Sequence, residues 1–297
     1  MGVEVRLSRA RDCPLCGGRP TGPTFPYATR FNDVHFDYLK CGACESVLVD
    51  PVPDAQTFSR MYAKAAYHDR HYDGGEGADY SDSARLLGQY LGSGATVLDY
   101  GCGLGSFLKT CKSQGFAPIG VELDGETAQF AAKNANCEAI SAEAFAMFNK
   151  ARRFDAIHMG DILEHLPDPA GILSHLLEFL KPGGVLFVEG PLEVNPSPVF
   201  WAARSYGAVK RVLKPQFLSN HPPTHLFRTD ANAQREFFIR VSNRLSMSYW
   251  QVYETGWPYS CGGLVKRSIA ALAVLLGGRN LAGATFGNRF RAILTKV

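Results

Sequence analysis

The sequence lacks any long apolar run. The longest uninterrupted one, Ile269–Leu276, has eight residues, whereas a transmembrane helix needs about 20. The opening residues, MGVEVRLSRARDCP, contain neither the apolar core nor the small-residue cleavage site of a secretory signal. We therefore expect a cytoplasmic protein without a membrane span, in which cysteines stay reduced.

The sequence also lacks a strong excess of positive or negative charge. The chain has 31 Lys and Arg against 28 Asp and Glu, a formal net charge of +3 over 297 residues. This balance does not favour nucleic acid as a partner, because nucleic-acid binders carry a strong basic footprint. With 46% hydrophobic residues and no internal repeat, the chain can build a sizeable core. We expect one large domain with a small appendage.

Four of the eight cysteines are paired in spacing. Cys13 and Cys16 lie in CPLCGG, and Cys41 and Cys44 lie in KCGAC. Two C-x-x-C turns are typical of a zinc site, and four thiolates leave no position for a substrate, so the metal would be structural. We expect a zinc ribbon over residues 1–50 whose folding depends on the metal. The alternative is four unrelated thiols. The remaining cysteines are predicted to be ordinary core residues: Cys102, Cys111, Cys137 and Cys261.

Residues 51–94 have the composition of a linker with a helical arm. Prolines come first, a helical stretch is predicted over Phe58–Tyr67, and glycines follow. The arm would lead toward the active site. Its Tyr67 and Tyr72 either cover a bound ligand or pack as part of a hinge.

From Ala95 the sequence alternates short apolar stretches with amphipathic helical ones. This pattern predicts a Rossmann-like α/β fold, a parallel sheet with helices on both faces. Asp168 and Pro169 mark a helix start that KPGG would end. We assign residues 95–297 to this domain, with a lid insertion at about 191–230. The expected parallel strands are ATVLDY, PIGVELD, CEAIS, FDAIHMG and GVLFVEG; two later strands are SMSYWQVYE and FRAILTKV.

A glycine-rich turn follows the first of these strands. Gly101, Gly103 and Gly105 lie in DYGCGLGSF, and Ser106 stands where a dinucleotide-binding G-x-G-x-x-G motif would have its last glycine. In an open α/β sheet such a turn brings bare backbone close to a ligand. A carboxylate at Asp99 would repel a pyrophosphate and attract a cation. We therefore expect a ligand that carries positive charge at this point.

The pattern D-x-G-C-G-x-G-x-F, followed 23 residues after Asp99 by Glu122 in GVELD, resembles class I S-adenosylmethionine-dependent methyltransferases. EHLPDP and LKPGG, in that order, strengthen the resemblance. It implies that Asp99 and the three glycines hold the methionine end of the cofactor. It further implies that Glu122 binds the ribose hydroxyls, that Glu143 lies near the adenine and that Asp161 closes the pocket.

The whole chain resembles a narrower group. CPLCG, then YLKCGACESVLVDPVPDAQTFSRMYAKAAY, then the methyltransferase motifs are similar to bacterial methyltransferases with an amino-terminal zinc ribbon. That group is associated with sugar, surface-polysaccharide, lipid and natural-product pathways. The resemblance implies a small-molecule, glycan or lipid-linked acceptor. A hydroxyl is the most favoured target, ahead of nitrogen or carbon.

Two histidines are candidate catalytic residues. Methyl transfer requires an aligned acceptor and, for a hydroxyl, a base, and histidine suits neutral pH. His225 in NHPPTHLFRTD would act as the base or bind the acceptor; alternatively it only orders its loop. Asp161, Glu164 and His165 match a pattern that holds a divalent ion in ubiquinone-pathway O-methyltransferases, which implies Mg²⁺ near the acceptor. Alternatively, Glu164 and His165 form hydrogen bonds where a helix begins.

Two further segments combine apolar and basic residues. Val199–Lys214 interleaves aromatic residues with four cations, which suits an acceptor lid, a helix on a membrane surface, or a solvated face. A later helical stretch, LVKRSIAALAVLLGG, has an apolar stripe that favours core packing or a homodimer interface over lipid contact: Val265, Ile269, Leu272 and Leu276.

The favoured function is therefore methyl transfer from S-adenosylmethionine, with a structural zinc ion. Two alternatives stay open at this point. An RNA methyltransferase with a zinc-ribbon RNA-binding module would bind RNA in a salt-sensitive way. A non-catalytic scaffold would use the same two modules only to bind a protein partner.

Overall fold

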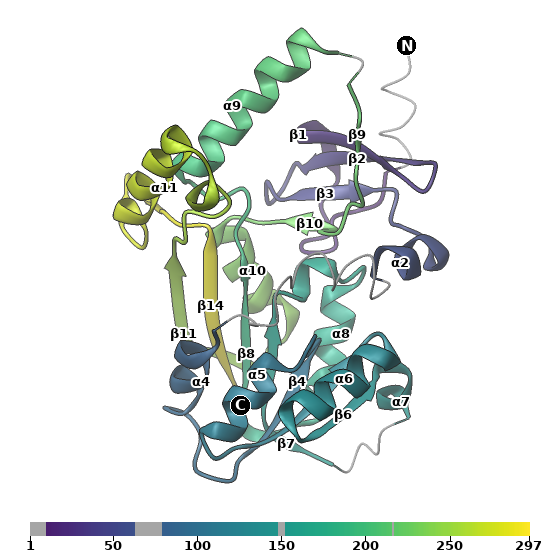
Figure 1. Cartoon of the computed structure of the whole chain (residues 1–297), viewed down its shortest axis with the longest axis vertical. Coiled ribbons are helices and arrows are strands. Elements are labelled where there is room, and N and C mark those ends of the chain that lie inside the picture. The colour runs from purple at the N-terminus through teal and green to yellow at the C-terminus, as the bar shows by residue number, and fades with distance from the viewer. Residues whose placement is uncertain (1–9, 63–78, 148–151, 216) are drawn as a thin grey trace.

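The computed structural model describes the whole chain except residues 1–9, 63–78, 148–151 and 216. The strands form a seven-stranded sheet in the order β11-β14-β8-β7-β4-β5-β6, a five-stranded sheet in the order β10-β3-β2-β1-β9, and the short pair β12-β13. Figure 1 shows the five-stranded sheet above one end of the seven-stranded sheet. Tyr67 and Tyr72 lie outside the described residues.

The seven-stranded sheet confirms the predicted α/β fold. The five strands from β8 to the edge strand β6 are parallel, and β14 runs antiparallel to both of its neighbours. These strands are β4 (Thr96–Tyr100), β5 (Ala117–Glu122), β6 (Glu138–Ser141), β7 (Phe154–Gly160), β8 (Leu180–Pro191), β11 (Leu245–Tyr253) and β14 (Arg289–Lys296).

Helices cover both faces of this sheet because strand side chains alternate between two cores. Val97 and Ala156 face α4 and α5, whereas Leu98 and Ile157 face α7, α8 and α10. The helices around the sheet are α4 (Ser81–Leu87), α5 (Ser106–Ser113), α6 (Gly125–Ala135), α7 (Ala142–Ala146), α8 (Pro169–Leu176) and α10 (Ala231–Val241).

Helix α8 begins as predicted, but the KPGG segment after it has a different structure from the one predicted. The Asp168 side chain accepts a hydrogen bond from the backbone N–H of Gly171 at 2.9 Å, so it caps the helix. The KPGG segment, predicted to end the helix, instead lies within β8. Phe154 pairs with Leu180 and Ala156 with Val185, so residues 181–184 form an irregular bulge in that strand.

The glycine turn between β4 and α5 has left-handed backbone at all three glycines. Their φ angles are +85° at Gly101, +51° at Gly103 and +85° at Gly105. A Cβ atom at Gly101 would lie 2.7 Å from the Ile162 side chain, and one at Gly105 would lie 3.0 Å from the carbonyl oxygen of Ala131. Conformation and close packing therefore both require glycine here.

The five-stranded sheet is built from two distant parts of the chain. Residues from the first 50 supply β1 (Pro20–Phe31), β2 (Val34–Cys41) and β3 (Val47–Asp50), while β9 (Ser219–Asn220) and β10 (Phe227–Arg228) come from the segment predicted to be a lid. Cys41 and Leu48 share a core with Leu163 and Phe227. The amino-terminal module is thus packed onto the large sheet through the 219–228 segment.

Three further helices lie at the edges of the fold. The predicted arm contains α2 (Ala55–Tyr62), and the carboxy-terminal half contributes α9 (Pro198–Leu213) and α11 (Leu264–Leu276). The expectation of core packing along α11 was wrong for Val265 and Leu272, which are exposed. No helix in the described part of the chain has the length and apolarity to cross a membrane. The remaining short elements are η1 (Leu163–His165), η2 (Tyr259–Cys261), β12 (Asn280–Leu281) and β13 (Ala284–Thr285).

The glycine turn yields a stability prediction. Replacing Gly105 with alanine should lower the free energy of unfolding by about 1–3 kcal/mol, because the new Cβ meets backbone in a left-handed conformation. The matched control is Gly125→Ala at the start of α6, where nothing lies within 4 Å of the added Cβ. Urea unfolding should show no loss for that control. Equal stability of the two variants would contradict this account of the turn.

Candidate active site and cysteine cluster

A pocket opens at the carboxyl ends of β4, β5 and β7, beside the glycine turn. This is the edge at which open α/β sheets bind their ligands. The residues that line it come from the turn, the strand ends and the arm: Tyr62, Tyr80, Asp99, Gly101, Cys102, Gly103, Leu104, Ser106, Phe107, Glu122, His158, Gly160, Asp161, Ile162 and His165. Most of the predicted cofactor residues are therefore brought together in one place.

Glu122 lies at the end of β5 and faces the glycine turn. One carboxylate oxygen accepts a hydrogen bond from the N–H of Gly103 at 2.8 Å, and the other accepts one from the N–H of Leu123 at 2.7 Å. Burial raises the pKa of this carboxyl group. Glu143, by contrast, is exposed in the first turn of α7 and does not line the pocket.

Asp99 has a partner that the sequence did not predict. Its Oδ1 atom lies 2.7 Å from Nδ1 of His158 on the adjacent strand β7, and both residues are buried. Nε2 of the same imidazole lies 3.3 Å from Oε1 of Glu189 on β8. One histidine thus connects two carboxylates across three strands, and the ring of Phe107 stacks on it with 3.7 Å between centroids.

The charges in this network support one another. Burial opposes a charge on His158, but hydrogen bonds and attraction from Asp99 and Glu189 outweigh it and raise the pKa of the imidazole to about 9. Burial likewise opposes ionisation of Glu189, yet His158, Ser83 and Arg291 lower its pKa to about 2. The floor of the pocket therefore contains an imidazolium at neutral pH, and the charge of Asp99 is partly compensated.

Asp161 lines the pocket but is held by an arginine from β14. Both of its carboxylate oxygens accept hydrogen bonds from Nη2 of Arg289 at 2.7 Å. The predicted metal set of Asp161, Glu164 and His165 is therefore not brought together. Glu164, His165 and His225 are grouped instead, with one ligand atom of each within 4.8 Å of the others.

This group of three side chains is largely buried. Within the described residues, Oε1 of Glu164 has no hydrogen-bond partner, and burial raises the pKa of the carboxyl group to about 7. Nδ1 of His165 lies 2.7 Å from the carbonyl oxygen of Thr224 and 2.8 Å from the hydroxyl of Tyr62. The rings of His165 and His225 meet edge to face at 4.7 Å.

His225 is oriented by a carboxylate that sequence reasoning missed. Its Nδ1 lies 2.7 Å from Oε2 of Glu193, whose other oxygen pairs with Arg228 at 3.1 Å. Burial lowers the pKa of His225, but the neighbouring Glu193 carboxylate raises it by more, so the pKa lies above its usual value. Burial opposes ionisation of Glu193, but Arg228 and His225 lower its pKa to about 2. No local spacing connects two residues 32 positions apart.

The loop that carries His225 is fixed on both sides by backbone hydrogen bonds. The carbonyl oxygen of Leu226 accepts from the N–H of Val49 in β3 at 3.0 Å, and the N–H of Leu226 donates to the carbonyl oxygen of Glu164 at 2.8 Å. Arg11 also donates to the Leu226 carbonyl, at 3.2 Å. The amino-terminal sheet thus sets the position of a histidine beside the pocket.

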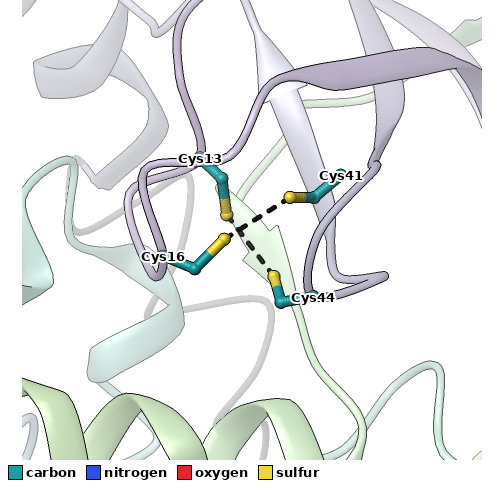
Figure 2. Close-up of side chains that lie close together, drawn as sticks. All are labelled: Cys13, Cys16, Cys41 and Cys44. Atoms are coloured by element: carbon teal, nitrogen blue, oxygen red, sulfur yellow. Dashed lines mark hydrogen bonds between the residues drawn. The ribbon is translucent and has the colours of Figure 1, made fainter.

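The four predicted metal-ligand cysteines converge at one end of that sheet (Figure 2). Sγ of Cys13 lies 3.7 Å from Sγ of Cys44, and Sγ of Cys16 lies 3.5 Å from Sγ of Cys41. Backbone N–H groups of Gly18 and Ala43 donate to two of the sulfurs at 3.4 Å. The two sulfur–sulfur distances are far longer than the roughly 2.05 Å of a disulfide bond.

Comparisons with known proteins identify a related family and several related sequences. A family model described as a methyltransferase domain matches residues 68–229. Ubiquinone biosynthesis O-methyltransferase of Pasteurella multocida is 31% identical over 131 residues, 39% of this chain and 53% of that protein. The enzyme of the same name from Psychrobacter cryohalolentis is 32% identical over 173 residues, 53% of this chain and 66% of its own length. The chain spans about half to two thirds of these two relatives.

Among solved structures, the SAH-bound magnesium protoporphyrin IX methyltransferase of Synechocystis PCC 6803 has a TM-score of 0.53 at 12% identity. The match covers 82% of this chain and all of that one. It shows a shared fold. The chain therefore belongs to the methyltransferase-domain family. More particularly, its large sheet has the class I fold of S-adenosylmethionine-dependent methyltransferases.

The buried network predicts how stability depends on pH. The folded pKa of His158 is about 9 and the unfolded pKa is about 6.5, so the folded state binds the proton more tightly. The stabilisation is fully present below about pH 6.5 and is lost as pH rises through about 9, by up to about 3 kcal/mol. Urea unfolding between pH 7 and about 9.5 measures it.

Two variants separate this effect from other titrations. His158→Phe should lower stability at pH 7 by about 3–5 kcal/mol, because it leaves two buried carboxylates without their shared partner, and should flatten the pH dependence. His175→Asn, a half-buried histidine in the last turn of α8, should keep the wild-type profile. A steep alkaline loss that persists in His158→Phe would contradict the assignment.

Proposed function

We propose that this chain transfers the methyl group of S-adenosylmethionine to a hydroxyl of a small-molecule, glycan or lipid-linked acceptor. The observation that carries the proposal is the pair His165 and His225 beside the cofactor pocket, with His225 oriented by Glu193. A base oriented by a carboxylate is the arrangement that proton removal from a hydroxyl requires. The O-directed activity named for the curated relatives supports the same target atom.

The residues of the pocket suit S-adenosylmethionine, which supplies an electrophilic methyl group on a sulfonium ion. Gly101 and Gly103 leave backbone bare in the pocket for the methionine end, and Gly105 completes the turn. Each oxygen of Glu122 accepts one backbone N–H and retains a lone pair for a ribose hydroxyl. Asp99 accepts a hydrogen bond from the ammonium group of the cofactor, and Asp161 accepts one at the edge of the nucleoside.

In this proposal the two histidines have different roles. His165 lies on the pocket wall and contacts the acceptor, with Nδ1 fixed by Thr224 and Tyr62. His225 directs Nδ1 to Glu193, so its Nε2 is the atom that takes the hydroxyl proton. Glu193 then stabilises the imidazolium that forms.

A magnesium ion is not part of the proposal. The group that the structure brings together has two imidazoles and one carboxylate, whereas magnesium prefers oxygen ligands and water. The other predicted oxygen ligand, Asp161, is engaged by Arg289. Proton removal is therefore assigned to the protein side chains alone.

We also propose that Cys13, Cys16, Cys41 and Cys44 bind a structural zinc ion. Tetrahedral zinc with Zn–S bonds of about 2.3 Å has sulfur–sulfur edges of about 3.8 Å, close to the 3.5 and 3.7 Å found here. We assign three modules: the ribbon over residues 1–50, the arm over 51–94 and the methyltransferase domain over 95–297, whose residues 219–228 supply two strands of the amino-terminal sheet.

The proposed chemistry is tested by separating cofactor binding from turnover. His225→Gln and Glu193→Gln should bind S-adenosylhomocysteine as the wild type does but transfer methyl groups about 10²–10⁴-fold more slowly. Glu122→Ala should weaken binding of S-adenosylhomocysteine at least about tenfold, through the loss of two charge-assisted hydrogen bonds to the ribose. The exposed neighbour Glu126→Ala is its matched control.

Calorimetry measures the binding, and radiolabelled S-adenosylmethionine measures transfer to catechol, glycan and lipid-linked acceptors. Wild-type rates in His225→Gln, or transfer to none of these hydroxyl acceptors and to an amine or a carbon instead, would contradict the proposal.

The zinc site is tested by metal analysis. The purified chain should contain about one zinc per molecule, and Cys16→Ser should lose it and unfold at a lower temperature, because metal binding contributes folding free energy. Cys261→Ser, the exposed cysteine near α11, should keep the metal and the melting temperature. Zinc content that does not change in Cys16→Ser would contradict the assignment.

A further inference from the structure

Helices α9 and α11 are poorly covered by the rest of the molecule. Along its 16 residues α9 buries only Val199, and α11 buries only Ala270 and Ala273. The two helices pack against each other at the end of the molecule where α9 projects (Figure 1). Both have apolar sequences, so a large apolar area faces outward.

The exposed residues of α9 form one stripe. Tyr206, Val209, Val212 and Leu213 are 57–80% exposed, and at 3.6 residues per turn they fall within an arc of about 120°. Another side of the helix faces β1, because a Cβ atom at Gly207 would lie 2.6 Å from the Phe25 ring. The helix is therefore attached through one side and presents the apolar stripe elsewhere.

Helix α11 adds a second set of exposed apolar side chains. The set begins just before the helix and continues to its last turn: Trp257, Leu264, Val265, Leu272, Val274 and Leu275. Val265 and Leu272 belong to the stripe for which the sequence predicted core packing or a homodimer interface. An exposed apolar surface of this kind marks an interaction site.

The same segments are basic and contain no acid. Residues 198–218 and 255–288 together hold seven of the 31 Lys and Arg of the chain and none of its 28 Asp and Glu, so the rest of the chain is net negative. Within the described part, none of the seven pairs with a carboxylate. They are Arg204, Lys210, Arg211, Lys214, Lys266, Arg267 and Arg279.

We propose that the α9–α11 surface binds anionic lipid bilayers peripherally. Apolar side chains exposed on one side of a helix, with Lys and Arg on its other sides, are the composition of a helix that lies in a membrane interface, and Trp and Tyr are enriched at that depth. Each cation near an anionic leaflet adds about 1 kcal/mol of attraction. A symmetric dimer through this surface would place like charges opposite each other, so the bilayer is the better complement.

Helix α9 starts from the edge of the sheet at which the pocket opens. Helix α9 begins seven residues after β8 ends at Pro191, and β8 is parallel to the strands whose carboxyl ends form the pocket. If the proposed acceptor class holds, this position favours the lipid-linked member of that class. Membrane binding itself does not depend on the acceptor.

Vesicle flotation with the full chain tests the proposal. We expect binding to phosphatidylcholine vesicles that contain about 30% phosphatidylglycerol, and at least tenfold weaker binding to pure phosphatidylcholine or at high salt. Val212→Ser/Leu213→Ser and Lys214→Gln/Arg267→Gln should each weaken binding at least about tenfold. Ile239→Ser/Arg240→Gln on the exposed side of α10 should not weaken it.

The outcomes are distinct from those of the catalytic tests. All variants should retain binding of S-adenosylhomocysteine, which reports an intact fold. The proposal is overturned if the wild type does not float with anionic vesicles, or if it floats equally with neutral ones. It is also overturned if the variants of the α9–α11 surface only convert a dimer to a monomer in light scattering. Failure of methyl transfer with vesicle binding retained would refute the proposed function alone.

Discussion

His158 lies between two buried carboxylates, and the organisation of the pocket depends on that contact. Asp99 on β4, His158 on β7 and Glu189 on β8 connect three adjacent strands through their side chains, and Arg291 on β14 adds a fourth. The imidazolium compensates the charge of the buried carboxylates on either side of it. The strand ends that carry the glycine turn and Asp161 are thereby held together, with a compensated charge beneath the cofactor site.

The amino-terminal module contacts a second set of residues beside the pocket. Its cysteines bring β2 and the turn before β1 together, its sheet includes β9 and β10 at opposite edges, and the loop between these two strands carries His225. Main-chain hydrogen bonds from Val49 and to Glu164 hold Leu226, the residue after His225, on both sides. The amino-terminal module thus contacts the loop that carries His225 directly.

Local patterns predicted much of this molecule. Alternating apolar strands and amphipathic helices, the Asp168 cap, the glycine turn and the paired cysteines each depend on residues that are close in sequence, where spacing reports geometry directly. The pocket residues Asp99, Glu122 and Asp161 were found for the same reason, since each stands at a strand end and parallel strands end at one edge. The bulge in β8 departs from the prediction because strand boundaries respond to packing.

The sequence by itself determined the α/β architecture, the family and the metal-type cysteine spacing, because these follow from periodicity and short motifs. Only the tertiary structure decided the partners: Asp99 with His158, 59 positions apart, Asp161 with Arg289, 128 apart, and His225 with Glu193. It also decided that β9 and β10 join the amino-terminal sheet and that α11 is exposed. Such contacts link segments whose separation has no period, so they arise only when the chain is folded.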